Sequence, residues 1–137
     1  MRIQFDEKYF MAKAIDEAKI ALSMGEVPIG AVIVADDRII ARAHNQVERL
    51  NDVTAHAEML AITSAANYLG GKYLENCTMY VTMEPCQMCA GALYWSRISK
   101  IYYGAEDPKR GFTALGNLMH PKTCLLYTSD AADESSS

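Results

Sequence analysis

The spacing of hydrophobic residues predicts an amphipathic helix from about Asp6 to Met24, followed by a β-hairpin. Asp6 suits the N-cap of that helix, and Gly25 suits its C-terminal stop. A continuous apolar run from Ile29 to Ala35 then predicts a buried strand. The Asp36-Asp37 pair predicts a turn, after which residues 38–44 return as the partner strand.

The rest of the chain alternates predicted helices with predicted strands. Polar residues 45–53 predict a loop before a helix that Thr54 can cap and that starts at His56. Pro85 suits the first position of a further helix, which runs to about Ser96. Strands are predicted at residues 78–83, 100–104 and, after a long connection over 105–121, from about Lys122. The order predicts an α/β/α three-layer fold around a mixed five-stranded sheet.

Length and composition narrow the class of protein. The chain has 137 residues, half of them apolar, which predicts one domain with an ordinary core. No apolar run approaches the ~18 residues of a membrane span, and no export signal is evident, so we expect no membrane segment and a cytoplasmic protein with reduced cysteines. The net charge of −4 argues mildly against nucleic-acid binding. Residues 97–122, however, carry five basic and two acidic side chains, a modest basic face that can attract phosphate.

Two short motifs, 30 residues apart, carry the candidate chemistry. The first is His56-Ala57-Glu58, and the second is Pro85-Cys86-Gln87-Met88-Cys89. One imidazole and two thiolates are zinc ligands that leave a fourth position open for a water of lowered pKa. Glu58 is not needed as a ligand and can move a proton. The combination H-x-E with P-C-x-x-C is a known signature of zinc deaminases that act on nucleobases.

Two alternatives remain open for these motifs. A closed structural zinc site needs a fourth ligand, but none of the candidates stands at a C-x-x-C or H-x-x-x-H spacing from the trio: His44, His120, Cys77 and Cys124. A redox dithiol would not need the His-Ala-Glu motif.

With these residues in place, the chain resembles the bacterial tRNA-specific adenosine deaminases from about residue 5 to Thr123. The resemblance rests on residues 26–32, on His44-Asn45, and on residues 51–58, 80–93 and 103–111. It implies hydrolytic, zinc-dependent deamination of the wobble adenosine to inosine, with one Zn²⁺ per chain. It also implies that the partners are the tRNA anticodon stem-loop and a second copy of the chain, bound through the helix after Cys89.

The resemblance further implies roles for individual residues. His56, Cys86 and Cys89 would bind zinc, and Glu58 would be catalytic. The residues that would bind the substrate are Asn45 on the purine, Ile29 and Ala57 in the base pocket, and Asp107 and Lys109 facing the RNA. From the residues alone, Asn45 at a strand end is typical of a turn, and Lys109-Arg110 is typical of a solvated turn.

Alternatives to this function also stay open. The zinc motifs are shared with cytosine and guanine deaminases, and a non-catalytic, zinc-stabilised RNA-binding domain would carry them too. We expect residues 1–123 to form the deaminase domain without the C-terminal helix of the family. Residues 124–137 resemble a translated sequencing adapter, and we expect this foreign tail to be ordered as a strand only to about Leu126 or Tyr127.

Overall fold

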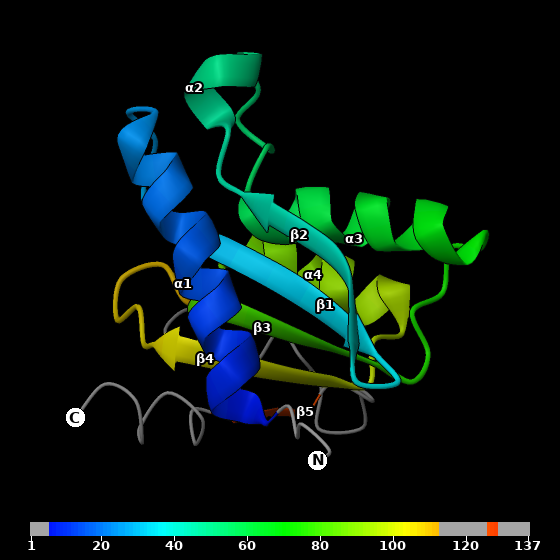
Figure 1. Cartoon of the computed structure of the whole chain (residues 1–137). Coiled ribbons are helices and arrows are strands. Elements are labelled where there is room, and N and C mark those ends of the chain that lie inside the picture. The colour runs from blue at the N-terminus through cyan, green and yellow to red at the C-terminus, as the bar shows by residue number, and fades with distance from the viewer. Residues whose placement is uncertain (1–5, 113–125, 129–137) are drawn as a thin grey trace.

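A computed structural model describes residues 6–112 and 126–128 of the chain (Figure 1). The order of its helices and strands is α1 (Glu7–Ser23), β1 (Gly30–Ala35), β2 (Arg38–His44), α2 (Val47–Leu50), α3 (Ala57–Leu69), β3 (Cys77–Met83), α4 (Gln87–Ser96), β4 (Lys100–Ala105) and β5 (Leu126–Thr128). None of the helices in this part of the chain is long and apolar enough to cross a membrane.

The strands form one mixed sheet in the order β2-β1-β3-β4-β5. β1 pairs antiparallel with β2 and β3, whereas β3, β4 and β5 run parallel. Helix α1 crosses one face of the sheet, and α3 and α4 lie against the other (Figure 1). The predicted α/β/α fold with a mixed five-stranded sheet is therefore confirmed.

Strands β1 to β4 supply side chains to two separate hydrophobic clusters, because successive residues of a strand point to opposite faces of the sheet. On β1, Ala31 and Ile33 join the cluster under α3 and α4, and Val32 and Val34 join the cluster under α1. The α1 cluster also holds Tyr80, whose ring lies 5.3 Å from the ring of Phe10 and 5.0 Å from that of Tyr102, measured between centroids. Burial on both faces fixes the register of the central strands.

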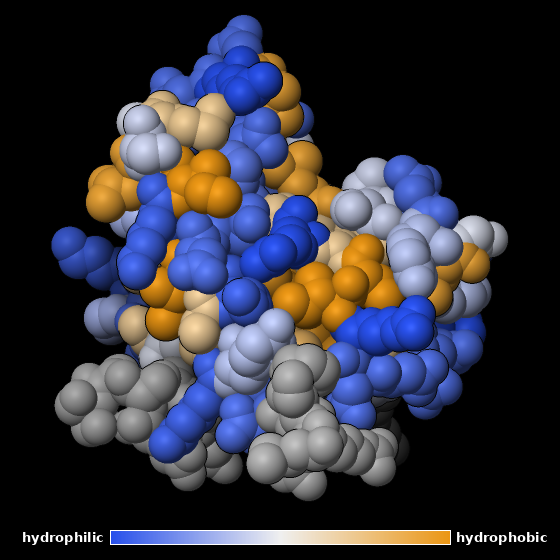
Figure 2. Space-filling view, in the orientation of Figure 1, coloured by the Kyte–Doolittle hydropathy of each residue, from blue (hydrophilic) through white to orange (hydrophobic). Residues whose placement is uncertain are grey.

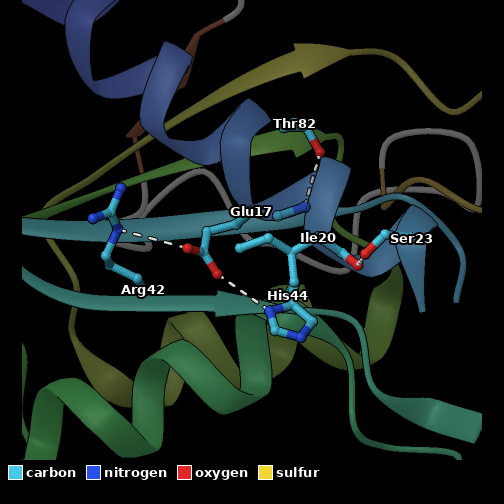
Figure 3. Close-up of polar contacts among 7 residues, drawn as sticks. Glu17, Ile20, Ser23, Arg42, His44 and Thr82 are labelled. Atoms are coloured by element: carbon cyan, nitrogen blue, oxygen red, sulfur yellow. Dashed lines mark hydrogen bonds and ion pairs between the residues drawn. The ribbon is translucent and has the colours of Figure 1, made fainter. Parts of the chain in front are cut away.

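Polar contacts tie α1 to the edge strand β2 (Figure 3). The Glu17 carboxylate lies 3.6 Å from Arg42 Nε and 3.2 Å from His44 Nδ1. At the start of the same helix, Asp6 is the N-cap, as predicted, and its carboxylate accepts a hydrogen bond from the Tyr9 N–H. In this view the outer surface of α1 is largely hydrophilic, and hydrophobic surface gathers over β2, where the burial of the sheet edge is incomplete (Figure 2).

Three local predictions are wrong. The predicted loop over residues 45–53 contains the single-turn helix α2. The N-cap of α3 is His56 rather than Thr54, because the Thr54 hydroxyl donates to Asp52 Oδ1 instead. Pro85 lies before α4 rather than at its first position, since Cys86 is the N-cap. The first error is a missed helix, and the other two shift a helix end by one or two residues.

The C-terminal predictions are only partly open to comparison. Most of the connection after β4 and the predicted strand start near Lys122 lie outside the described residues. Strand β5, Leu126–Thr128, falls inside the segment that we expected to be foreign, and it pairs with β4. The predicted last strand therefore exists, while the origin of residues 124–137 stays a prediction.

Gly30 provides a test of the packing between α1 and the sheet. A Cβ at this position would collide with the backbone of α1 at Ala14 and Ala18. We expect Gly30→Ala to lower the free energy of unfolding by about 1–3 kcal/mol through overpacking, measured by urea denaturation. Gly71→Ala is the matched control, because nothing lies within 4 Å of a Cβ there. Equal stability of the two variants would contradict the close approach of α1 to β1.

Candidate metal centre and base pocket

Three candidate ligands meet where two helices begin. His56 is the N-cap of α3, Cys86 is the N-cap of α4, and Cys89 lies in the first turn of α4. The His56 Nδ1 atom lies 3.7 Å from Cys86 Sγ and 3.5 Å from Cys89 Sγ. A tetrahedral zinc ion with ordinary bond lengths places a nitrogen and a sulfur ligand about 3.6 Å apart. The trio therefore fits zinc, and it is the only such cluster in the described part of the chain.

The two cysteines differ in acidity because they share a proton. The pKa of Cys86 is lowered to about 5, chiefly by a hydrogen bond from the Cys89 thiol and further by backbone N–H groups at the start of α4. The same hydrogen bond, together with burial, raises the pKa of Cys89. A bound metal displaces that proton, since zinc requires both sulfurs as thiolates. The backbone N–H groups at the start of α4 that have no partner within the helix also favour the thiolate forms of the two cysteines.

Glu58 lies in the first turn of α3 and is 3% exposed. Burial is the main cause that raises its pKa to about 7. Its Oε1 atom has no hydrogen-bond partner among the described residues. An unpaired buried carboxylate oxygen is unfavourable unless a water, ion or substrate completes its hydrogen bonding. Glu58 is therefore placed to exchange a proton beside the metal trio.

A pocket of about 490 Å³ opens beside these residues, within the range typical of small-molecule sites. Of the residues predicted from the sequence, it is lined by Ile29, Asn45, Glu58 and Asp107, together with the ligands His56 and Cys86. Three other predicted residues do not line it. The candidate ligand Cys89 is fully buried in the first turn of α4. Ala57 is fully buried in the core cluster under α3, and Lys109 is exposed. Arg110, its neighbour, lines the pocket instead.

The Asp107 carboxylate forms hydrogen bonds within its own loop. Its Oδ1 atom accepts hydrogen bonds from the N–H groups of Lys109 and Arg110, at 3.1 and 3.0 Å. The end of this loop returns to the metal motif, because the Phe112 N–H donates to the Pro85 carbonyl, at 2.9 Å. Asp107 therefore shapes the loop that closes one side of the pocket.

Two buried carboxylates of the pocket wall were missed in the sequence. Glu84 Oε1 accepts from the Asp107 N–H at 3.1 Å, and Gly111 leaves room for its carboxyl group, which a Cβ would meet. Glu26 accepts from the N–H groups of Glu48 and Arg49. In the sequence, each is an acidic residue near a proline and an apolar segment. This pattern is too common to indicate a buried carboxylate. Both carboxylates act through contacts more than 20 residues away in sequence.

Comparison with known proteins agrees with this geometry. Residues 5–105 match the family described as "Cytidine and deoxycytidylate deaminase zinc-binding region". Two curated proteins named tRNA-specific adenosine deaminase are similar. The one from Aquifex aeolicus is 55% identical over 105 residues, which cover 77% of this chain and 70% of that protein. The one from Bacillus subtilis is 53% identical over 114 residues, which cover 83% and 70%.

The chain belongs to the tRNA-specific adenosine deaminase family. It is a zinc-dependent deaminase, and the His–Cys–Cys trio fits one Zn²⁺ per chain.

Solved structures place the deaminase among enzymes for two different bases. A structure from work on A-to-I editing by tRNA:A34 deaminases has a TM-score of 0.80 at 44% identity and covers 88% of this chain and 97% of that one. A guanine deaminase from Bacillus subtilis has a TM-score of 0.73 at 43% identity, covering 74% and 66%. The fold is thus common to both classes of enzyme.

The assignment of the zinc ligands can be tested by elemental analysis. We expect Cys86→Ala to lose the single zinc per chain and to lower the melting temperature, because metal binding and folding are coupled. Cys77→Ala is the control, since Cys77 is also a free thiol of the described chain, more deeply buried than Cys86, but lies outside the trio. Full zinc retention in Cys86→Ala would contradict the assignment.

Proposed function

We propose that this deaminase converts the wobble adenosine of tRNA to inosine by hydrolysis. The observation that supports the proposal most directly is the shared pocket. It brings Glu58, which has an unpartnered carboxylate oxygen, the buried residue Asn45 and two of the three candidate zinc ligands, His56 and Cys86, to one cavity. The names of the most similar curated proteins and the tRNA:A34 deaminase structure support the choice of substrate.

In this proposal, His56, Cys86 and Cys89 hold the zinc ion. Zinc, when bound there, supplies an acidified water as the nucleophile for the purine ring. Glu58 accepts a proton from that water at its free Oε1 atom and delivers it to the ring nitrogen next to the reacting carbon. It then passes the second proton to the departing amino group, so that adenosine and water become inosine and ammonia. Burial raises the pKa of Glu58, which favours the uptake and release of a proton by this carboxyl group.

The pocket walls would orient the base. Asn45 can both donate and accept hydrogen bonds, so its amide can pair with the edge of a purine. Ile29 would pack against the ring, and Ala57 would support the pocket from the core rather than from its surface. Asp107 and Lys109 would contact RNA through the loop that Asp107 shapes. The pocket admits a base only after it has left the stack, as in other enzymes that act on nucleobases.

The proposed partners are the tRNA anticodon stem-loop and a second copy of the deaminase. Helix α4 supports the dimer, because Leu93 faces the core while Tyr94 and Trp95 are exposed, Trp95 by 77%. An exposed tryptophan of this kind is typical of a contact surface. The cytoplasm, where tRNA is modified, is the proposed location.

The decisive experiment uses an RNA hairpin with adenosine at the first anticodon position, and measures inosine after nuclease digestion. Free guanine is assayed in parallel by ammonia release, because one similar solved structure is a guanine deaminase. Inosine formation supports the proposal. Ammonia from guanine without inosine identifies a guanine deaminase, and no product from zinc-loaded protein identifies a non-catalytic RNA-binding domain.

Replacement of Glu58 separates proton transfer from metal binding. We expect Glu58→Gln to retain one zinc per chain and the wild-type fold, but to lose at least ~10²-fold in the rate of deamination. Glutamine keeps the shape of the buried side chain but cannot carry the proton. A stoichiometric loss of zinc in this variant would make Glu58 a metal ligand, contrary to the mechanism.

A further inference from the structure

Glu26 is a buried acid in the connection between α1 and β1, and it is 4% exposed. Its Oε1 atom accepts a hydrogen bond from the Glu48 N–H at 3.0 Å, and its Oε2 atom accepts from the Arg49 N–H at 2.8 Å. No lysine, arginine or histidine side chain of residues 6–112 forms an ion pair with it. Backbone N–H groups alone therefore compensate the burial of this carboxylate.

The two donors belong to α2, a helix that has little else to stabilise it. Helix α2 is a single turn, none of its residues is buried, and its own N-cap residue, Gln46, makes no side-chain capping hydrogen bond. An isolated turn of helix is unstable in water. Glu48 and Arg49 are its second and third residues, which are the positions that an N-cap side chain normally serves. Glu26 thus supplies the missing cap from 22 and 23 residues away.

The cap joins two walls of the pocket. Glu26 and Ile29 line it from the α1–β1 connection, and Val47 and Val53 line it from the segment that contains α2. Asn45 lies directly before that segment, and its N–H donates to the Ile29 carbonyl at 3.0 Å. If α2 moves, the wall beside Asn45 moves with it.

We propose that Glu26 is a positioning residue that sets the fit of the base pocket by capping α2. Each of its oxygens accepts a backbone N–H of α2, and it is not a member of the metal trio. Its removal therefore weakens substrate binding and leaves zinc content and the chemical step intact.

The principal variant is Glu26→Gln. Glutamine has the same shape, but its NH₂ group faces one of the two backbone N–H groups, so at most one hydrogen bond remains. We expect KM for the RNA hairpin to rise about tenfold to a hundredfold, as for the loss of a charged hydrogen bond, with kcat within about threefold of wild type. Glu75→Gln is the matched control, because it removes the same charge from an exposed residue that pairs with Arg97 at 3.9 Å.

Amide hydrogen exchange provides a readout that needs no substrate. Only the kinetic measurement of this inference rests on the proposed function. Faster exchange of the backbone N–H groups of Glu48 to Leu50 in Glu26→Gln supports the cap even if the hairpin is not deaminated. If Glu26→Gln does not fold, Glu26→Asp takes its place. Aspartate keeps the charge but is one methylene too short to reach both donors, and should give smaller changes in the same direction. Wild-type KM and wild-type exchange, or a fall in kcat at unchanged KM, would overturn the proposal.

Discussion

The site depends on one geometric constraint, which is that two helices must begin at the same end of the sheet. Strand β3 runs back from the end of α3 to the start of α4, so both helix N-termini lie at its carboxyl end. The lengths match, since the 13 residues of α3 span about 20 Å and the 7 residues of β3 span about 23 Å. Gly70 reverses the chain after α3 in a left-handed conformation, with φ at 73°. His56 and the two cysteines therefore meet without a long loop to order.

Three buried glutamates, Glu26, Glu58 and Glu84, differ in whether their carboxylate oxygens are hydrogen-bonded. Each is no more than 4% exposed. The carboxylates of Glu26 and Glu84 accept hydrogen bonds from backbone N–H groups of the pocket walls, so their burial stabilises loops. Of the three, only Glu58 has a buried oxygen without a partner in the described part of the chain, and it follows the candidate ligand His56 by two residues. The unpaired oxygen is the feature that distinguishes a group held for proton transfer from a group held for packing.

The sequence predicted the parts of the structure that depend on local patterns. The helix after Asp6, the Asp36-Asp37 turn and the central strands follow from hydrophobic period and turn chemistry, and the metal trio follows from a motif with fixed spacing. The turn residues both have positive φ, as a tight hairpin requires. Helix α2 could not be predicted, because four residues are too few to show a helical period and its cap comes from Glu26, distant in sequence. The sequence also could not predict which side chains line the pocket. Ala57 is buried in the core, and of the neighbours Lys109 and Arg110 only Arg110 lines the pocket, because the fold of the loop decides the direction of each side chain.

The metal trio and the walls of the base pocket contribute differently to the choice of base. A tRNA:A34 deaminase structure and a guanine deaminase are 44% and 43% identical to this chain, although the first matches 88% of it and the second 74%. The metal trio cannot decide between their bases, because a His–Cys–Cys zinc centre activates water in the same way for either ring. Discrimination must come from groups that contact the base edge and from the walls that set their positions. In this deaminase those walls are the α2 segment, which Glu26 holds, and the Asp107 loop, which Glu84 holds. We therefore expect substitutions that change base preference to fall in these two segments rather than in the metal centre.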